Sequence, residues 1–501
     1  MNRPRWLGPA LVAGGFLALA VLAFALKWPL LHTVPYGDEH THFALARDHE
    51  DPTPGYRDVW GNPNGVPLAT FWQRPAFYVA FHIPATFGFD EFRITQALVA
   101  SLLAPLGAAL VRAHGGSRVA AAGAGIALAV GPPFVLWGAY AFMDVLMMVA
   151  FLAFLLARHA RRWRTSAALA ILAVWTKETA YAGLVVLFAI DLVRTMRAGR
   201  ASLYPLSLGE REASLAWAIV IAPLPLAWAI AGGLLPPGGV AYGNLADIVG
   251  LLLPSIWLLP LLALGLAFPR SRFLSAAGVA SFLAFVVLHL SGRAVESWYA
   301  VPSLVFGILG CASAADALVR AATSRGLGLR IASVGPGLAA FALCLAFAFL
   351  PAGKARDAMD PLGEPSANLD EVYHYETQVR GQDLVAALAE VPLDRHVDVL
   401  MAQNGWPLPW VQLESAGTVY LDFAGFRGTV GFSVHALAER IENATTWTLV
   451  GPGQDPMQKA IPDVYGDCHV ATHGDWKVFY GATCAGREED LRIANHAYGG
   501  P

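Results

Sequence analysis

The sequence is dominated by long apolar segments that alternate with short stretches carrying charge. A window of about 19 residues, the length of helix that crosses the hydrocarbon core of a bilayer, detects roughly eleven such segments. They lie near residues 7–33, 92–113, 118–136, 140–157, 166–176, 178–194, 213–233, 245–268, 273–291, 298–319 and 331–351. The pattern predicts a polytopic α-helical membrane protein, because apolar helices satisfy their own backbone hydrogen bonds within lipid.

Arginine and lysine are concentrated in alternate loops between these segments. Because cations favour the cytoplasmic side, the bias predicts a multi-pass plasma-membrane protein with a cytoplasmic N-terminus. The cytoplasmic group comprises Arg112, Arg118, Arg158, Arg161, Arg162, Arg164, Arg194, Arg197, Arg200, Arg211, Arg270, Arg272, Arg320, Arg325 and Arg330. Some cations fall on the outer side and need a local reason, of which anion binding is one: Arg47, Arg57, Arg74, Arg93, Lys177 and Arg293.

The chain changes character after about residue 351, where polar residues become frequent and the apolar runs become short. Alternating runs at 397–401, 418–423, 446–450 and 476–480 predict strands, and residues 377–390 have a helical pattern. We therefore expect a membrane domain over 1–351 and a small extracytoplasmic α/β domain over 352–501. In that compartment Cys468 and Cys484 would form a disulfide.

Composition limits the classes of partner. With 56% hydrophobic and 14% charged residues, the chain is too apolar for one soluble core. The net charge of −3, without any concentrated basic face, argues against a nucleic-acid partner.

Two adjacent carboxylates, Asp38 and Glu39, stand in the first outer loop (34–91), where we expect amphipathic helices. Charge beside a membrane helix is costly to hold and is usually functional. The alternative is that Asp38 caps the amphipathic stretch 39–49, and the two roles are compatible.

Further charged residues are predicted at the same outer face. Arg74 precedes an apolar piece too short to span, and Asp144 lies near the start of the fourth apolar segment. Interfacial snorkelling would be an alternative role for Arg74, and a helix cap or packing hydrogen bond for Asp144. Lys177 either pairs with Glu178 or Asp144, or holds a phosphate.

The last outer loop contributes Arg293, Glu296 and Tyr299, although tyrosine is also an ordinary anchor at the membrane interface. Carboxylates and cations thus come from loops scattered along the sequence. Sugar transfer from a lipid phosphate uses this mixture, since a base takes the acceptor proton and cations stabilise the leaving phosphate.

The order of Gly37-Asp38-Glu39, Arg74-Pro75 with Tyr78, Met143-Asp144 and Thr176-Lys177 resembles the GT-C superfamily of membrane glycosyltransferases. The resemblance is to the branch that contains protein O-mannosyltransferases and lipid A aminoarabinose transferases. It implies a GT-C-like fold and inverting transfer from a polyprenyl-phosphate donor at the outer face to an acceptor hydroxyl.

The same resemblance implies roles for individual residues. Asp38 would be the acceptor-activating base, Glu39 would support it and Asp144 would orient groups around the sugar. Arg74, Lys177 and Arg293 would hold the donor phosphate. The expected lining of the substrate pocket is His42, Tyr78, Glu178, Glu296 and Tyr299. Some superfamily members use a divalent metal at the first-loop acid, to which His40 or His42 could contribute.

This sequence departs from the family pattern in two places. Arg74-Pro75-Ala76 replaces a lysine before two prolines, and Lys177-Glu178 replaces a lysine followed by glycine. Two other classes of protein stay open: a transporter or flippase of lipid-linked glycans, and a non-catalytic assembly protein. The acceptor can equally be a protein, a lipid or another glycan.

Overall fold

The computed structural model forms two compact units, Met1–Leu31 with Phe71–Val372 and His32–Thr70 with Tyr373–Pro501. It describes residues 7–31, 42–43, 46–47, 74–140, 142–197, 202–203, 206–207, 209–225, 227, 257–290, 300–324, 338–346, 399–401, 419–421, 447–450, 469–473 and 476–480. The unit that comprises Met1–Leu31 and Phe71–Val372 is called the membrane unit, and the unit that comprises His32–Thr70 and Tyr373–Pro501 is called the sheet unit. The units do not divide as the predicted domains do, since residues 32–70 of the first loop group with the C-terminal residues.

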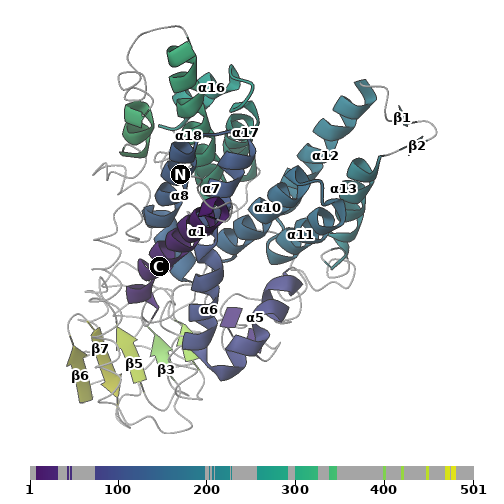
Figure 1. Cartoon of the computed structure of the whole chain (residues 1–501). Helices are drawn as coiled ribbons and strands as arrows, with labels where there is room; N and C mark the ends of the chain where they lie inside the picture. The colour runs from purple at the N-terminus through teal and green to yellow at the C-terminus, as the bar shows by residue number, and fades with distance from the viewer. Residues whose placement is uncertain are drawn as a thin grey trace. The chain divides into compact units, whose positions relative to one another are not determined.

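The membrane unit is helical (Figure 1). Its named elements are α1 (Leu7–Ala25), the 3-10 turn η1 (Trp28–Leu30), α5 (Pro75–Phe87), α6 (Phe89–Ser101), α7 (Leu103–Ala113), α8 (Arg118–Val130), α9 (Pro132–Ala139), α10 (Met143–His159), α11 (Trp163–Thr176), α12 (Ala180–Arg197), α13 (Glu210–Ile221), α16 (Leu259–Leu266), α17 (Arg272–Leu290) and α18 (Val301–Ser324). A short antiparallel hairpin, β1 (Ser202–Leu203) with β2 (Leu206–Ser207), lies between α12 and α13.

Three of the described helices are long and apolar enough to cross a membrane: Val12–Leu30, Phe89–Ala113 and Val301–Thr323. A fourth span results if α8 and α9 count together, although they bend by 53°. The bend follows from Pro132 and Pro133, which begin a new helix and truncate the segment predicted at 118–136. The total of roughly eleven spans stays a prediction.

Helix α10 lies at the centre of the membrane unit and packs against α7, α11 and α18. Its sequence is apolar around nearly its whole circumference between Asp144 and Arg158, and most of its residues are buried. A helix that is apolar on all sides belongs inside a bundle, which explains its central position.

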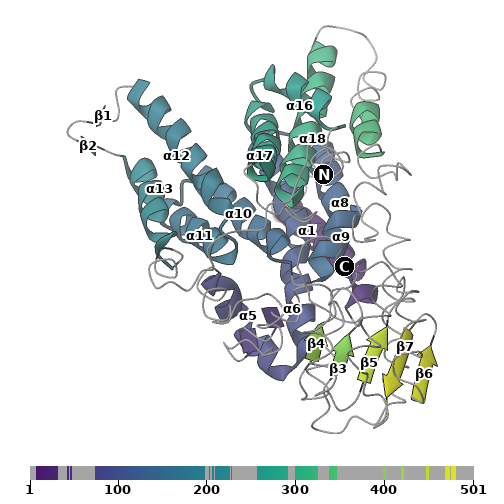
Figure 2. The same cartoon turned by 180° about the vertical axis from the view of Figure 1, so that it is seen from behind.

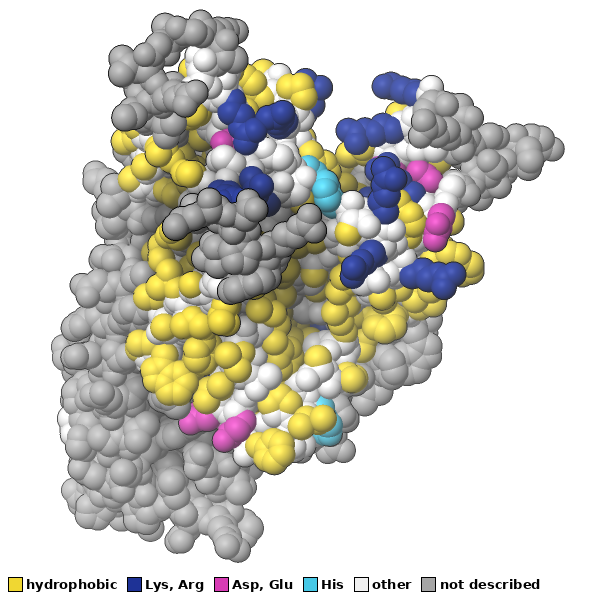
Figure 3. Space-filling view, viewed as in Figure 1, with side chains coloured by type: hydrophobic (Ala, Val, Ile, Leu, Met, Phe, Trp, Pro, Cys, Tyr) yellow, Lys and Arg dark blue, Asp and Glu magenta, His cyan; other side chains and the backbone are white. Residues whose placement is uncertain are grey.

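Charge is distributed unevenly along the membrane unit. In Figure 3 the Lys and Arg side chains gather at one end of a broad hydrophobic band, together with some acidic and His side chains, whereas the charged side chains visible at its other end are acidic. The span 89–113 carries Asp90 and Glu91 in its first turn and Arg112 in its last. This separation agrees with the predicted concentration of Arg and Lys in alternate loops. Which end of the membrane unit faces the cytoplasm stays a prediction.

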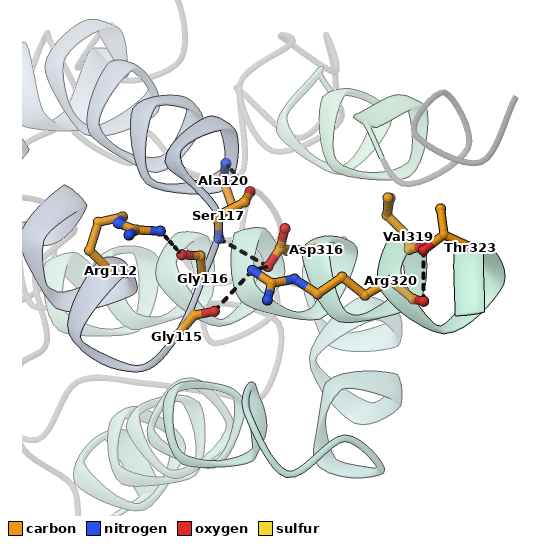
Figure 4. Close-up of polar contacts among 9 residues, drawn as sticks. All are labelled: Arg112, Gly115, Gly116, Ser117, Ala120, Asp316, Val319, Arg320 and Thr323. Atoms are coloured by element: carbon orange, nitrogen blue, oxygen red, sulfur yellow. Dashed lines mark hydrogen bonds and ion pairs between the residues drawn. The ribbon is translucent and has the colours of Figure 1, made fainter. Parts of the chain in front are cut away.

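At the arginine-rich end, the turn between α7 and α8 is tied to α18 (Figure 4). The Asp316 carboxylate accepts a hydrogen bond from the Ser117 backbone N–H at 3.0 Å and pairs with Arg320 at 2.7 Å. Arg320 also donates to the Gly115 carbonyl. Gly115 has a φ of +84°, a conformation that favours glycine, so the tight turn depends on it.

The sheet unit contains a five-stranded mixed sheet, visible in Figures 1 and 2, with strand order β4-β3-β5-β7-β6. Its strands are β3 (Val399–Met401), β4 (Val419–Leu421), β5 (Trp447–Val450), β6 (His469–His473) and β7 (Trp476–Tyr480). Strand β3 is parallel to β4 and β5, and β7 is antiparallel to β5 and β6.

Four of these strands fall within the runs predicted from alternation, and β6 was not predicted. The sequence of β6, His-Val-Ala-Thr-His, has two apolar residues side by side in place of alternation. The helix predicted at 377–390 lies outside the described residues, so the α/β domain over 352–501 stays a prediction.

Candidate functional site

Asp144 lies in the first turn of α10, at the end of the membrane unit opposite the arginine cluster. The residue at the N-cap position is Phe142, and no side chain caps the helix there. The Asp144 side chain is 1% exposed. The helix-cap alternative is therefore wrong, and a buried carboxylate at this depth needs a charged or hydrogen-bonding partner.

That partner is Lys177. It follows α11 with extended backbone, which ends the helix and turns its side chain towards α10. Its Nζ lies 2.5 Å from Oδ2 of Asp144, and its own side chain is 4% exposed. Of the pairings left open by the sequence, the structure shows the one between Lys177 and Asp144.

Glu178 pairs with Arg74 instead. Arg74 occupies the N-cap position of α5, which packs against α11 and so brings the guanidinium beside the loop after α11. Its Nε and Nη2 donate to the two oxygens of Glu178 at 3.2 and 3.5 Å. Such a two-pronged contact fixes the planes of both groups.

The electrostatics of Glu178 reflect these neighbours. Burial by itself would raise the pKa of Glu178, but the positive charges of Arg74 and Lys177 outweigh it and lower the pKa to about 2. Glu178 is therefore ionised throughout the physiological range. The interaction of Asp144 with Arg74 and Glu178, as well as with Lys177, makes the four residues one charge cluster.

One atom of this cluster has no hydrogen-bond partner among the described residues. Oδ1 of Asp144 is buried and accepts no hydrogen bond from any residue that the structure describes. A buried carboxylate oxygen without a donor costs free energy, so it is a natural acceptor for a hydroxyl or N–H of a bound molecule.

Tyr78 lies one turn beyond Arg74 on α5 and is fully buried beside Phe77.

The chain is similar to the aminoarabinose transferase ArnT from Cupriavidus metallidurans in its apo state, with a TM-score of 0.54 and 16% identity. The match covers 94% of this chain and 98% of ArnT. The chain has the GT-C fold.

A second protein with the GT-C fold is the arabinofuranosyltransferase AftD from Mycobacteria, at a TM-score of 0.50 and 15% identity. This match covers 95% of the present chain but 42% of AftD, so the chain spans less than half of that protein. No protein-family model and no curated protein matches the sequence. The GT-C resemblance inferred from short motifs is thus confirmed at the level of fold.

Several of the predicted site residues lie outside the described part of the GT-C fold, so their roles stay predictions. They are Asp38, Glu39, His40, Arg293, Glu296 and Tyr299, together with Cys468 and Cys484 of the predicted disulfide. His42 is described and buried, and it belongs to the sheet unit.

Lys27 and Gln96 are two fully buried polar residues of the membrane unit that were not predicted from the sequence. Lys27 donates to the Ala23 carbonyl at 2.8 Å, and both amide atoms of Gln96 lack partners among the described residues. Arg93, one turn from Gln96, donates to the carbonyls of Leu30 and Leu31. In the sequence, an isolated cation or amide inside an apolar run is the signal that could have identified these residues.

A divalent metal was one expectation from the GT-C resemblance. Within the residues described here, no group of three or more His, Cys, Asp or Glu side chains could hold a metal ion. Asp144 and Glu178 are each already paired with a cation. Asp38 and His40, at which the resemblance places the metal, lie outside the described residues, so the metal stays an expectation.

Proposed function

We propose that the chain is a glycosyltransferase that moves a sugar, with inversion, from a polyprenyl-phosphate donor to an acceptor hydroxyl at the outer membrane face. The observation that carries this proposal is the buried Asp144–Lys177 pair beside Arg74 and Glu178, within a chain that has the GT-C fold. The sugar could be a hexose or a pentose.

The charge cluster suits the demands of this reaction. Negative charge grows on the phosphate oxygen as its bond to the sugar breaks, and fixed cations in a buried site stabilise that charge better than water does. Lys177 and Arg74 are the described cations for this role, with Arg293 from the last outer loop. Oδ1 of Asp144, which has no donor among the described residues, would accept a hydrogen bond from a sugar hydroxyl and so fix the ring.

The acceptor requires a base on the opposite side of the anomeric carbon. Asp38 would take the hydroxyl proton as the acceptor oxygen bonds to that carbon, with Glu39 supporting it. The phosphate leaves with the electron pair of the broken bond from the other face. A single displacement of this kind inverts the configuration and needs no covalent enzyme intermediate.

The polyprenyl tail of the donor would lie between helices, and His42, Tyr78, Glu296 and Tyr299 would line the pocket. We propose that the C-terminal domain shapes the entrance for the acceptor, which is a protein, a lipid or a glycan. Deletion of residues 365–501 should then change acceptor choice, measured by mass spectrometry of the products. Unchanged choice in a folded, active deletion variant would refute this role.

A transporter or flippase is the principal competing function. Transporters bind substrates near the bilayer midplane, on broken helices of internal repeats. The described charge cluster lies instead at one end of α10 and α11, which favours chemistry at the membrane surface.

The decisive experiment is transfer of radiolabelled sugar from a polyprenyl phosphate by the purified chain, compared with Asp38→Asn. The proposal predicts transfer by the wild type and a loss of at least about 100-fold in the variant. Flipping of the labelled lipid without any transfer would indicate the transporter instead. A chain that neither flips the lipid nor transfers the sugar would indicate an assembly protein.

A further inference from the structure

We infer that Glu178 is a specificity-determining residue: it competes with the donor's phosphate for the Arg74 guanidinium and so weakens binding of anionic lipid headgroups. The inference rests on the proposed function, because it concerns the same donor site.

The geometry of the Arg74–Glu178 contact supports the competition. Two nitrogens of the guanidinium face the two carboxylate oxygens at 3.2 and 3.5 Å. A phosphate presents two oxygens to arginine in the same forked arrangement. Glu178 thus holds the edge of Arg74 that a phosphate would use, and the two anions cannot occupy it together.

Glu178 can move away from Arg74, whereas the neighbouring pair is locked. Its side chain is 32% exposed and lies in the connection between α11 and α12, whereas Asp144 and Lys177 are 1% and 4% exposed. Moving Glu178 into water keeps its charge solvated, but separating Asp144 from Lys177 would leave two buried charges. The donor phosphate therefore displaces Glu178 from Arg74 and leaves the Asp144–Lys177 pair in place.

The competition has a consequence for the kind of lipid that binds. Glu178 stays ionised at neutral pH, so a bound headgroup meets its negative charge nearby whether or not it leaves Arg74. Repulsion grows with the charge of the headgroup. Glu178 thus disfavours a lipid pyrophosphate more than a lipid monophosphate.

The test measures binding of two probes, polyprenyl phosphate and polyprenyl pyrophosphate in detergent micelles, to the full-length chain. Glu178→Gln keeps the shape of the side chain but removes its charge. We expect it to bind the monophosphate about threefold to tenfold more tightly, because the Glu178 carboxylate no longer competes for Arg74. The gain for the pyrophosphate should be larger, and KM for the donor should fall with the affinity.

Two matched variants separate this mechanism from a general change in charge. In an Arg74→Gln background, Glu178→Gln should give no gain, because the group competed for is absent. Glu91→Gln removes an exposed carboxylate from the first turn of α6 and should leave both affinities unchanged. If the glutamine variant does not fold, Glu178→Asp, whose carboxylate is one methylene further from Arg74, should give a smaller gain in the same direction.

Two results would overturn the inference while leaving the proposed function intact: unchanged or weaker binding by folded Glu178→Gln, or a gain that persists without Arg74. Weaker binding would mean that Glu178 positions Arg74 for the phosphate, and unchanged binding would mean that the two anions do not compete. A wild-type chain that binds neither lipid and transfers no sugar would overturn the inference and the proposed function together.

Discussion

At the residue scale, the Asp144–Lys177 pair is tightly constrained. Both side chains are almost fully buried and lie 2.5 Å apart. Taking two charges out of water is expensive, and their attraction offsets this cost only while both are present. A buried ion pair adds little to stability compared with a pair of apolar residues in the same place, so its presence needs another reason. We propose that this reason is a role in the transfer reaction.

This pair gives a prediction for stability. Lys177→Met should lower the free energy of unfolding by about 3–5 kcal/mol, because it leaves the Asp144 carboxylate buried without its main cation. Thermal unfolding in detergent checks the loss. Adding Asp144→Asn to Lys177→Met should recover most of it, and a single variant as stable as the wild type would show that the pair is not buried.

A second prediction concerns Gly265 in α16, which packs against α18. A Cβ at Gly265 would come within 2.8 Å of Cβ of Ala314, which cannot move without its backbone. Gly265→Ala should therefore destabilise the chain by about 1–3 kcal/mol through overpacking. Gly14→Ala is the control, because its Cβ would meet nothing within 4 Å, and equal effects of the two substitutions would contradict this packing.

At the scale of elements, the arginine-rich end shows how helices distant in sequence are joined. His114 follows α7, stacks on Phe273 of α17 at 4.7 Å and lies 5.5 Å from the ring of His159 in α10. Burial, followed by the nearby His159, lowers the pKa of His114 to about 4. The neutral ring is thus part of the contact between α7, α10 and α17.

The lowered pKa predicts sensitivity to acid. An unfolded histidine has a pKa near 6.5, so the unfolded chain binds the proton more readily and acid favours unfolding. The contribution of His114 is complete above about pH 6.5 and is lost as the pH falls towards about 4. The melting temperature should drop less between pH 7.5 and 5 in His114→Phe, which keeps the stacking. An identical drop in both proteins would remove His114 as the cause.

At the scale of the whole molecule, the charge separation along the membrane unit predicts an orientation. A single cysteine at Arg161 should react with an impermeant maleimide only in opened cells, and one at Glu91 in intact cells. The background would be a variant in which Cys311, Cys344, Cys468 and Cys484 are replaced by serine. Labelling at Glu91 only after cell opening would place the charge cluster in the cytoplasm and exclude the proposed outer-face reaction.

The sequence predicted the features that depend on whether a residue is apolar or charged. Apolar segments located most of the helices, and loop charges located the arginine-rich end. It could not choose between Asp144 and Glu178 as the partner of Lys177. That choice depends on the packing of α5 against α11, which brings Arg74 to Glu178, and local sequence does not encode such a contact between distant helices.

Sugar transfer by a folded chain carrying both Asp144→Asn and Lys177→Met tests the central claim most directly, because this double change removes the pair without leaving a buried charge. If the pair performs chemistry, the variant should melt near the wild-type temperature and transfer sugar from polyprenyl phosphate at least about 100-fold more slowly. Transfer at the wild-type rate would contradict the account and leave the pair as a structural contact alone.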